Sequence, residues 1–139
     1  MPEPRTTIDD MLTAARARFP RLTPGEVRAA QDEGAIVIDL RCDVDRERVG
    51  VIPDSIPIPR TVLEWRADPV SPWKDQRIAD LGARLVLVCN DGYASSLAAA
   101  SLLDLGFTDV TDMEGGAHAW AAAGLPLESA SWSGREVRR

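Results

Sequence analysis

The sequence feature that most constrains the fold is the segment 84–106, which predicts a strand, a short loop and a helix in succession. Its first part, 85–88, is uniformly apolar, as expected of a strand buried on both faces of a parallel sheet. Its last part, 95–105, is rich in alanine and leucine and precedes Gly106, a residue that commonly ends a helix. A strand that needs cover on both faces predicts a layered α/β architecture.

Cys89 follows this strand directly and begins the short loop. The C-terminal edge of a parallel strand, just ahead of a helix, is where α/β sheets bind ligands. Loop amides and the helix dipole favour negative charge there, and the same field favours the nucleophilic thiolate form of a cysteine. A cysteine at a strand end can instead be a small apolar filler. The nucleophile is favoured here because the next residues are polar or small, as a tight anion-binding turn requires: Asn90, Asp91, Gly92, Tyr93 and Ala94.

Helical and extended patterns alternate along the rest of the chain. The expected helices are 8–19, 23–33, 60–66, 95–105 and 117–123, and the expected strands are 35–40, 56–59, 85–88 and 107–113. Residues 42–55 are expected to form a charged loop. This order predicts a three-layer α/β/α domain with a central, mainly parallel sheet and an added N-terminal helix. With 139 residues, we expect one such domain at 22–127, a helical extension at 1–21 and a tail at 128–139.

Composition narrows the function. The formal net charge is −6 with no basic block, which argues against nucleic-acid partners and anionic membranes. No apolar run approaches the roughly 18 residues of a membrane span, and the N-terminus lacks a signal-peptide pattern. We therefore expect a cytoplasmic protein whose two cysteines remain thiols. One histidine and two cysteines, without the usual ligand spacings, predict no metal site, and no cofactor is expected.

Five short motifs occur in a fixed order along the chain. They are an apolar strand ending in Asp39-Leu-Arg41, the proline-rich segment 50–59, the strand and loop 85–95, Leu-Gly-Phe-Thr-Asp-Val at 105–110, and Glu-Gly-Gly-Ala-His-Ala-Trp at 114–120 with Ala-Gly-Leu-Pro at 123–126. In this order they resemble the rhodanese-like domain family over roughly 22–127. Segments 60–66 and 92–96 resemble its bacterial, actinobacterial-type single-domain branch.

The resemblance implies a sulfurtransferase. Cys89 would take the outer sulfur of a small donor such as thiosulfate or a persulfide, and would hold it as a Cys–S–S⁻ persulfide. A thiophilic acceptor, a thiol or cyanide, would then remove that sulfur. The family's active-site loop corresponds to residues 90–95, so Asn90 to Ser95 are implied to bind the substrate through backbone N–H groups around the anion.

One departure from the family pattern concerns charge in the loop. Many active members carry a basic residue where this chain has Ala94, and Asp91 adds a negative charge. At an effective dielectric constant near 20, a like-charge pair about 6 Å apart costs on the order of 2–3 kcal/mol. A compensating cation is expected from Arg60, or else from Arg66 or Arg41, although Arg60 also fits a surface arginine and Arg41 an internal ion pair.

Several alternatives remain open at this stage. The chain can be a non-catalytic binding or sensing module of the same family, or a cysteine phosphatase, which would need an arginine closing the loop where Ala94 and Ser95 stand. Ser95 and Ser96 either donate to the sulfur anion or cap the helix. Cys42, at the same sheet edge, is a candidate resolving thiol. The four tryptophans are expected to lie in the core or to shield it: Trp65, Trp73, Trp120 and Trp132.

Overall fold

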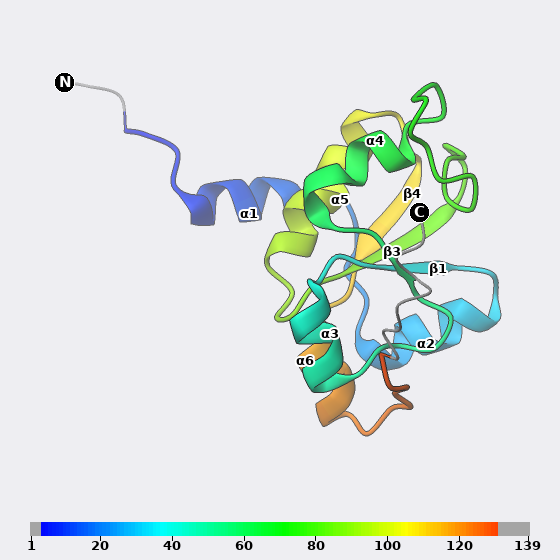
Figure 1. The fold of residues 1–139 in the computed structure, drawn as a ribbon. Helices are drawn as coiled ribbons and strands as arrows, with labels where there is room; N and C mark the ends of the chain where they lie inside the picture. Colours follow the sequence, from blue (N-terminus) through cyan, green and yellow to red (C-terminus); the bar gives the residue numbers. More distant parts are fainter. Residues whose placement is uncertain (1–3, 131–139) are drawn as a thin grey trace.

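Four parallel strands form the sheet at the centre of the protein (Figure 1). The computed structural model describes residues 4–130. The strands lie in the order β2 (Ile56–Pro57), β1 (Ile36–Asp39), β3 (Arg84–Val88) and β4 (Asp109–Asp112). Ile38 pairs with Leu87, and Leu87 pairs with Asp112. Because the strands are parallel, their C-terminal ends share one edge, and Cys89 follows β3 at that edge.

Helices cover both faces of the sheet. Their bounds are α1 (Ile8–Arg16), α2 (Pro24–Asp32), α3 (Asp43–Val49), the 3₁₀ turn η1 (Arg60–Val62), α4 (Leu63–Ala67), α5 (Ala94–Asp104) and α6 (Gly116–Ala122). Helices α4 and α5 cover one face, and α2 and α6 cover the other, with α3 beside α6 (Figure 1). Helix α1 packs against α5. The predicted three-layer fold with an added N-terminal helix is confirmed.

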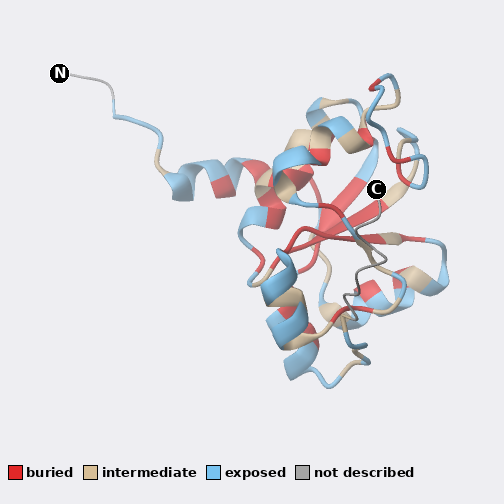
Figure 2. Ribbon diagram, viewed as in Figure 1, coloured by how far each residue is buried: buried red, intermediate tan, exposed pale blue. Residues whose placement is uncertain are grey.

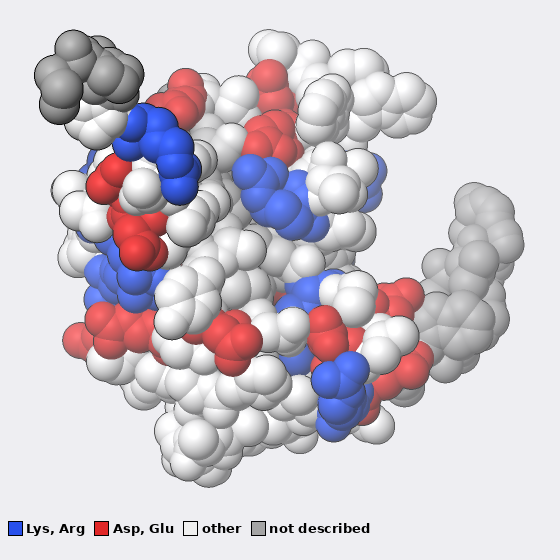
Figure 3. Space-filling model, turned by 90° about the vertical axis from the view of Figure 1, so that its left-hand side faces the viewer, with Lys and Arg blue, Asp and Glu red and all other residues white. Residues whose placement is uncertain are grey.

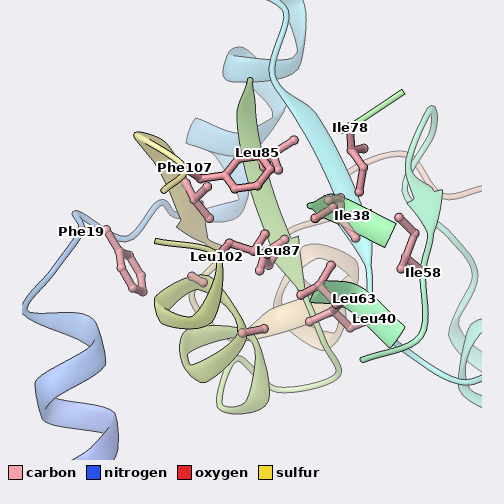
Figure 4. Packing of buried hydrophobic residues seen from close by; sticks show 14 residues of the cluster. Phe19, Ile38, Leu40, Ile58, Leu63, Ile78, Leu85, Leu87, Leu102 and Phe107 are labelled. Atoms are coloured by element: carbon pink, nitrogen blue, oxygen red, sulfur yellow. The ribbon is translucent and has the colours of Figure 1, made fainter. Parts of the chain in front are cut away.

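The apolar residues of β3 pack into the hydrophobic core on both faces of the sheet. Leu85 and Leu87 pack with Leu102 of α5, whereas Val86 and Val88 pack with Trp120 of α6. All six side chains are completely buried. Alternate residues of a strand point to opposite faces, so a strand covered on both sides needs apolar residues throughout. Figure 2 shows the strands buried while the helices are exposed outward, and Figure 4 shows Leu85 and Leu87 among side chains of the α5 layer.

Residues 42–55 contain the main error of the sequence-based prediction. The expected charged loop is wrong for residues 43–49, which form helix α3. No residue of α3 is buried, so its sequence lacks the apolar stripe from which a helix is predicted. Ion pairs one turn apart accompany the helix, Arg46 with Asp43 and Arg48 with Asp45. Helix α3 also begins at the residue after Cys42, which places that cysteine at its N-cap.

Smaller differences concern helix ends and tryptophans. Helix α1 ends at Arg16, three residues early, and Phe19 beyond it is buried in the core. Trp120 is buried as expected, but Trp65 and Trp73 are 57% and 66% exposed, so neither lies in the core. Trp132 and the rest of 131–139 lie outside the described residues. Within residues 4–130, no helix has the length and apolarity that crossing a membrane requires.

Candidate active site

The sulfur of Cys89 lies at the N-terminal end of α5. Its Sγ accepts hydrogen bonds from the backbone N–H groups of Gly92, at 3.2 Å, and Ser95, at 3.3 Å. The residue is 9% exposed. Amide donors fixed in this way stabilise negative charge on the sulfur without having to reorganise. An apolar filler would have no such donors, so the geometry favours a sulfur that carries charge.

Glycines let the loop close tightly around this sulfur. Gly92 has φ +85°, and a Cβ there would lie 2.7 Å from the backbone N of Gly115. The loop also rests on the start of α6, where Ala117 N–H donates to the Cys89 carbonyl at 2.8 Å and His118 N–H to the Asn90 carbonyl at 3.1 Å. The loop conformation therefore depends on residues of the 114–120 motif.

Asp112, the last residue of β4, is a buried carboxylate that holds residues of the loop through hydrogen bonds. It is completely buried and accepts hydrogen bonds from the hydroxyls of Ser95, at 2.8 Å, and Ser96, at 2.7 Å. Arg21 donates to both of its oxygens, at 2.8 and 3.1 Å. A buried carboxylate is tolerated only when paired and hydrogen-bonded in this way. The two hydroxyls therefore bind Asp112 and do not cap α5, so the predicted helix-cap role is wrong for them. Ser95 does donate to the sulfur, through its backbone N–H.

The ionisation of Arg21 is secured by the same contacts. Burial alone would lower the pKa of its guanidinium, but the hydrogen bonds and charge of Asp112 raise that pKa on balance, and the nearby Cys89 adds to the rise. Arg21 is thus a permanent positive charge beside the loop.

The cations expected from the sequence lie elsewhere. The Arg41 side chain is 1% exposed and bonds to Asp39 and the Gly50 carbonyl, so it is covered from any substrate. Arg60 pairs with Glu64. Arg66 donates to the Trp73 carbonyl. In the described contacts, these three side chains do not meet the loop.

The loop instead receives two arginines that the sequence did not single out. Arg16 of α1 and Arg21, which follows it, both donate to the Gly92 carbonyl, at 2.7 and 2.8 Å. More than 70 positions separate them from Gly92, and no motif surrounds them, so only the folded structure reveals them. The one usable sequence signal was the amphipathic helix 8–19, which predicted that this segment packs on the domain.

The sequence profile of the rhodanese-like domain family matches residues 23–123, most of the chain. The protein belongs to this family. The thiosulfate sulfurtransferase GlpE of Pseudomonas savastanoi pv. phaseolicola is 35% identical over 104 residues, which is 75% of this chain and 89% of GlpE.

Two solved structures are also similar to this rhodanese-like protein. One, from Rhodopseudomonas palustris, is described as a protein of unknown function and possible tyrosine phosphatase. It is 34% identical with a TM-score of 0.82, over 92% of this chain and 99% of that one. A coverage of 92% is more than residues 22–139 provide, so the likeness extends into the N-terminal extension. The other, a thiosulfate sulfurtransferase from Pseudomonas aeruginosa, is 27% identical with a TM-score of 0.68, over 89% of this chain and 23% of that one.

The outer rim of the rhodanese-like loop carries Asp91, Tyr93 and Ala94, all exposed. The Asp91 carboxylate lies 2.7 Å from Nδ1 of His118, so a protonated His118 would neutralise it. Tyr93 lies under the Arg16 guanidinium, which is 5.5 Å from the ring centre. These contacts link Asp91 to α6 and Tyr93 to α1.

Asn90 points the other way, toward α3. Its Nδ2 donates to Asp45 at 2.9 Å, and the thiol of Cys42 donates to the same carboxylate oxygen at 3.3 Å. The Asn90 hydrogen bond, followed by that of Cys42, lowers the pKa of Asp45. Cys42 and Cys89 are both free thiols. Residues 4–130 hold no cluster of three or more metal-ligating side chains.

Proposed function

We propose that this protein is a sulfurtransferase in which Cys89 carries the transferred sulfur as a persulfide. The observation that carries the proposal is the pair of amides aimed at Cys89 Sγ at the N-terminal end of α5. The 35% identity to a named thiosulfate sulfurtransferase supports the same activity.

The reaction is a two-step displacement. The Cys89 thiolate attacks the outer sulfur of the donor, and the donor's S–S bond breaks, with its electron pair leaving on sulfite or a thiolate. The product is Cys89–S–S⁻. A second nucleophile, a thiolate or cyanide, then attacks the terminal sulfur, and the electron pair returns to Cys89. No external oxidant or reductant is needed, because the sulfur moves without net electron gain.

Charge at the loop bears on the donor. We propose thiosulfate or a small persulfide as donor, and a thiol or cyanide as acceptor. On the face shown in Figure 3, basic and acidic side chains are interspersed. Because charges of opposite sign cancel one another, the electrostatic field that a donor meets depends on the residues at the loop itself. Asp91 opposes an anionic donor less when His118 is protonated, since the two side chains are in contact.

The proposal also divides the chain by role. Residues 22–127 would form the sulfur-transferring domain, since they contain the sheet and the Cys89 loop. Residues 1–21 would be an extension of it, carried by α1 on α5. We propose that the protein works in a reducing compartment, where Cys89 stays a thiol between turnovers.

A comparison of two activities tests this function. The purified protein should form thiocyanate from a sulfur donor and cyanide, and should leave an aryl phosphate unhydrolysed. The phosphatase is the second candidate, favoured by the description of the R. palustris structure. Against a phosphatase, this chain has Ala94 and Ser95 at the end of the loop, where a phosphatase needs an arginine to bind phosphate. Phosphate release without any sulfur transfer would overturn the proposal in favour of the phosphatase.

A further inference from the structure

Two arginine side chains from the N-terminal extension converge on one backbone oxygen of the loop, that of Gly92. Arg16 Nη2 lies 2.7 Å from it and Arg21 Nη2 2.8 Å. Both hydrogen bonds are charge-assisted and so stronger than ordinary amide contacts. The N–H of the same Gly92 is one of the two donors to Cys89 Sγ. The two arginines thus bind Gly92, the residue whose N–H contacts the sulfur.

The two hydrogen bonds from Arg16 and Arg21 also orient the peptide group between Gly92 and Tyr93. The Gly92 carbonyl belongs to the peptide that carries the Tyr93 N–H, and in a trans peptide these two groups point in opposite directions. Holding the oxygen toward the arginines therefore turns the Tyr93 N–H away from them. The Arg16 guanidinium also lies over the Tyr93 ring, which fixes the side chain of the same residue.

Each arginine is anchored at a second point. Arg21 forms the two-pronged pair with the buried Asp112, whose other partners are the hydroxyls of Ser95 and Ser96. Arg16 donates through Nε to the Ser96 hydroxyl at 2.9 Å. Both amide donors to Cys89, on Gly92 and Ser95, thus belong to residues held by this network. With two guanidiniums and one carboxylate, the network carries a net charge of +1.

We propose that Arg16 and Arg21 are positioning residues of the sulfur site, which hold the Gly92 peptide in place and supply the positive charge that the loop lacks at Ala94. The proposal rests on the proposed function, because it assigns them to a Cys89 that becomes anionic during sulfur transfer. It makes the extension at residues 1–21 part of the working site.

Arg16 is the better residue to change, because its removal leaves no buried carboxylate unpaired. In a Cys42→Ser background, where only Cys89 can react, Arg16→Met should slow alkylation by iodoacetamide at neutral pH about tenfold. Arg16→Lys, which keeps the charge, should recover part of that loss. The matched control is Arg18→Met, from the same segment, whose guanidinium contacts Asp104 and the Ala100 carbonyl on α5. Its alkylation rate should equal that of the parent.

Sulfur transfer by the same variants completes the test. The kcat/KM of Arg16→Met should fall about as far as its alkylation rate, and a cooperative thermal transition should show that the variant is folded. Equal alkylation and transfer rates for Arg16→Met and Arg18→Met would overturn the proposal. Alkylation needs no sulfur donor, so a parent protein inactive in transfer whose alkylation still depends on Arg16 would sink the proposed function and uphold the positioning role.

Discussion

Replacement of Cys89 by serine is expected to lower kcat/KM for sulfur transfer by roughly a thousandfold or more. A serine hydroxyl stays protonated at neutral pH and cannot form a persulfide, although it nearly matches the thiol in size. The Gly92 and Ser95 amides would still point at its oxygen, so the loop should keep its shape. Steady-state assays with a sulfur donor and cyanide measure the effect, and thermal melting checks that the variant is folded.

Cys42 provides the matched control for this experiment. Its thiol is exposed and donates to Asp45, and the proposed mechanism does not require it. Cys42→Ser should therefore transfer sulfur at nearly the rate of the parent protein. Full activity in Cys89→Ser would remove Cys89 from the reaction. If Cys42→Ser were the inactive variant, the sulfur would be carried at α3 instead.

The second large effect is expected at Gly116, where α6 meets the Cys89 loop. Gly116 has φ +64°, and a Cβ there would lie 2.5 Å from the carbonyl oxygens of Cys89 and Asn90. These are backbone atoms, which cannot rotate aside as a flexible side chain would. Gly116→Ala should therefore lower the free energy of unfolding by about 3 kcal/mol or more, measured by urea denaturation.

Gly124 provides a control that distinguishes the steric clash expected at Gly116 from the strain of a positive φ angle alone. It too has a positive φ, +73°, but a Cβ there would meet no atom within 4 Å. Gly124→Ala should cost only the left-handed conformation, about 1–2 kcal/mol, and should leave sulfur transfer intact. Gly116→Ala should in addition lose activity, because the Cys89–Asn90 backbone must shift. Equal destabilisation by the two substitutions would show that the close approach at Gly116 has no energetic weight.

Local patterns explain what the sequence predicted well. The strand at 85–88, the loop after it and the helix before Gly106 depend on neighbouring residues, and all three are observed. The helix expected at 23–33 also begins at a local signal: Thr23 Oγ1 accepts from Glu26 N–H, and the Glu26 side chain accepts from Thr23 N–H. Such features need no knowledge of distant segments.

The parts of the site that were missed depend on contacts between distant segments. Asp112 receives Arg21 from 91 positions away, and nothing in either local sequence indicates that they meet. Arg60 was expected near the loop because it follows a strand end, yet a helical turn aligns it with Glu64, four residues on. The place of Arg60 in the sequence correctly predicted the edge of the sheet at which it lies. It did not predict the direction in which its side chain points.

The most direct test of the central claim is the mass of the protein after incubation with a sulfur donor. A persulfide on Cys89 should add the mass of one sulfur atom, localised by peptide analysis to the segment containing Cys89, and cyanide should remove it. Cys42→Ser should gain the same mass, and Cys89→Ser should gain none. Added sulfur that persists in Cys89→Ser, or a parent protein that gains no sulfur from either thiosulfate or a small persulfide, would contradict the account.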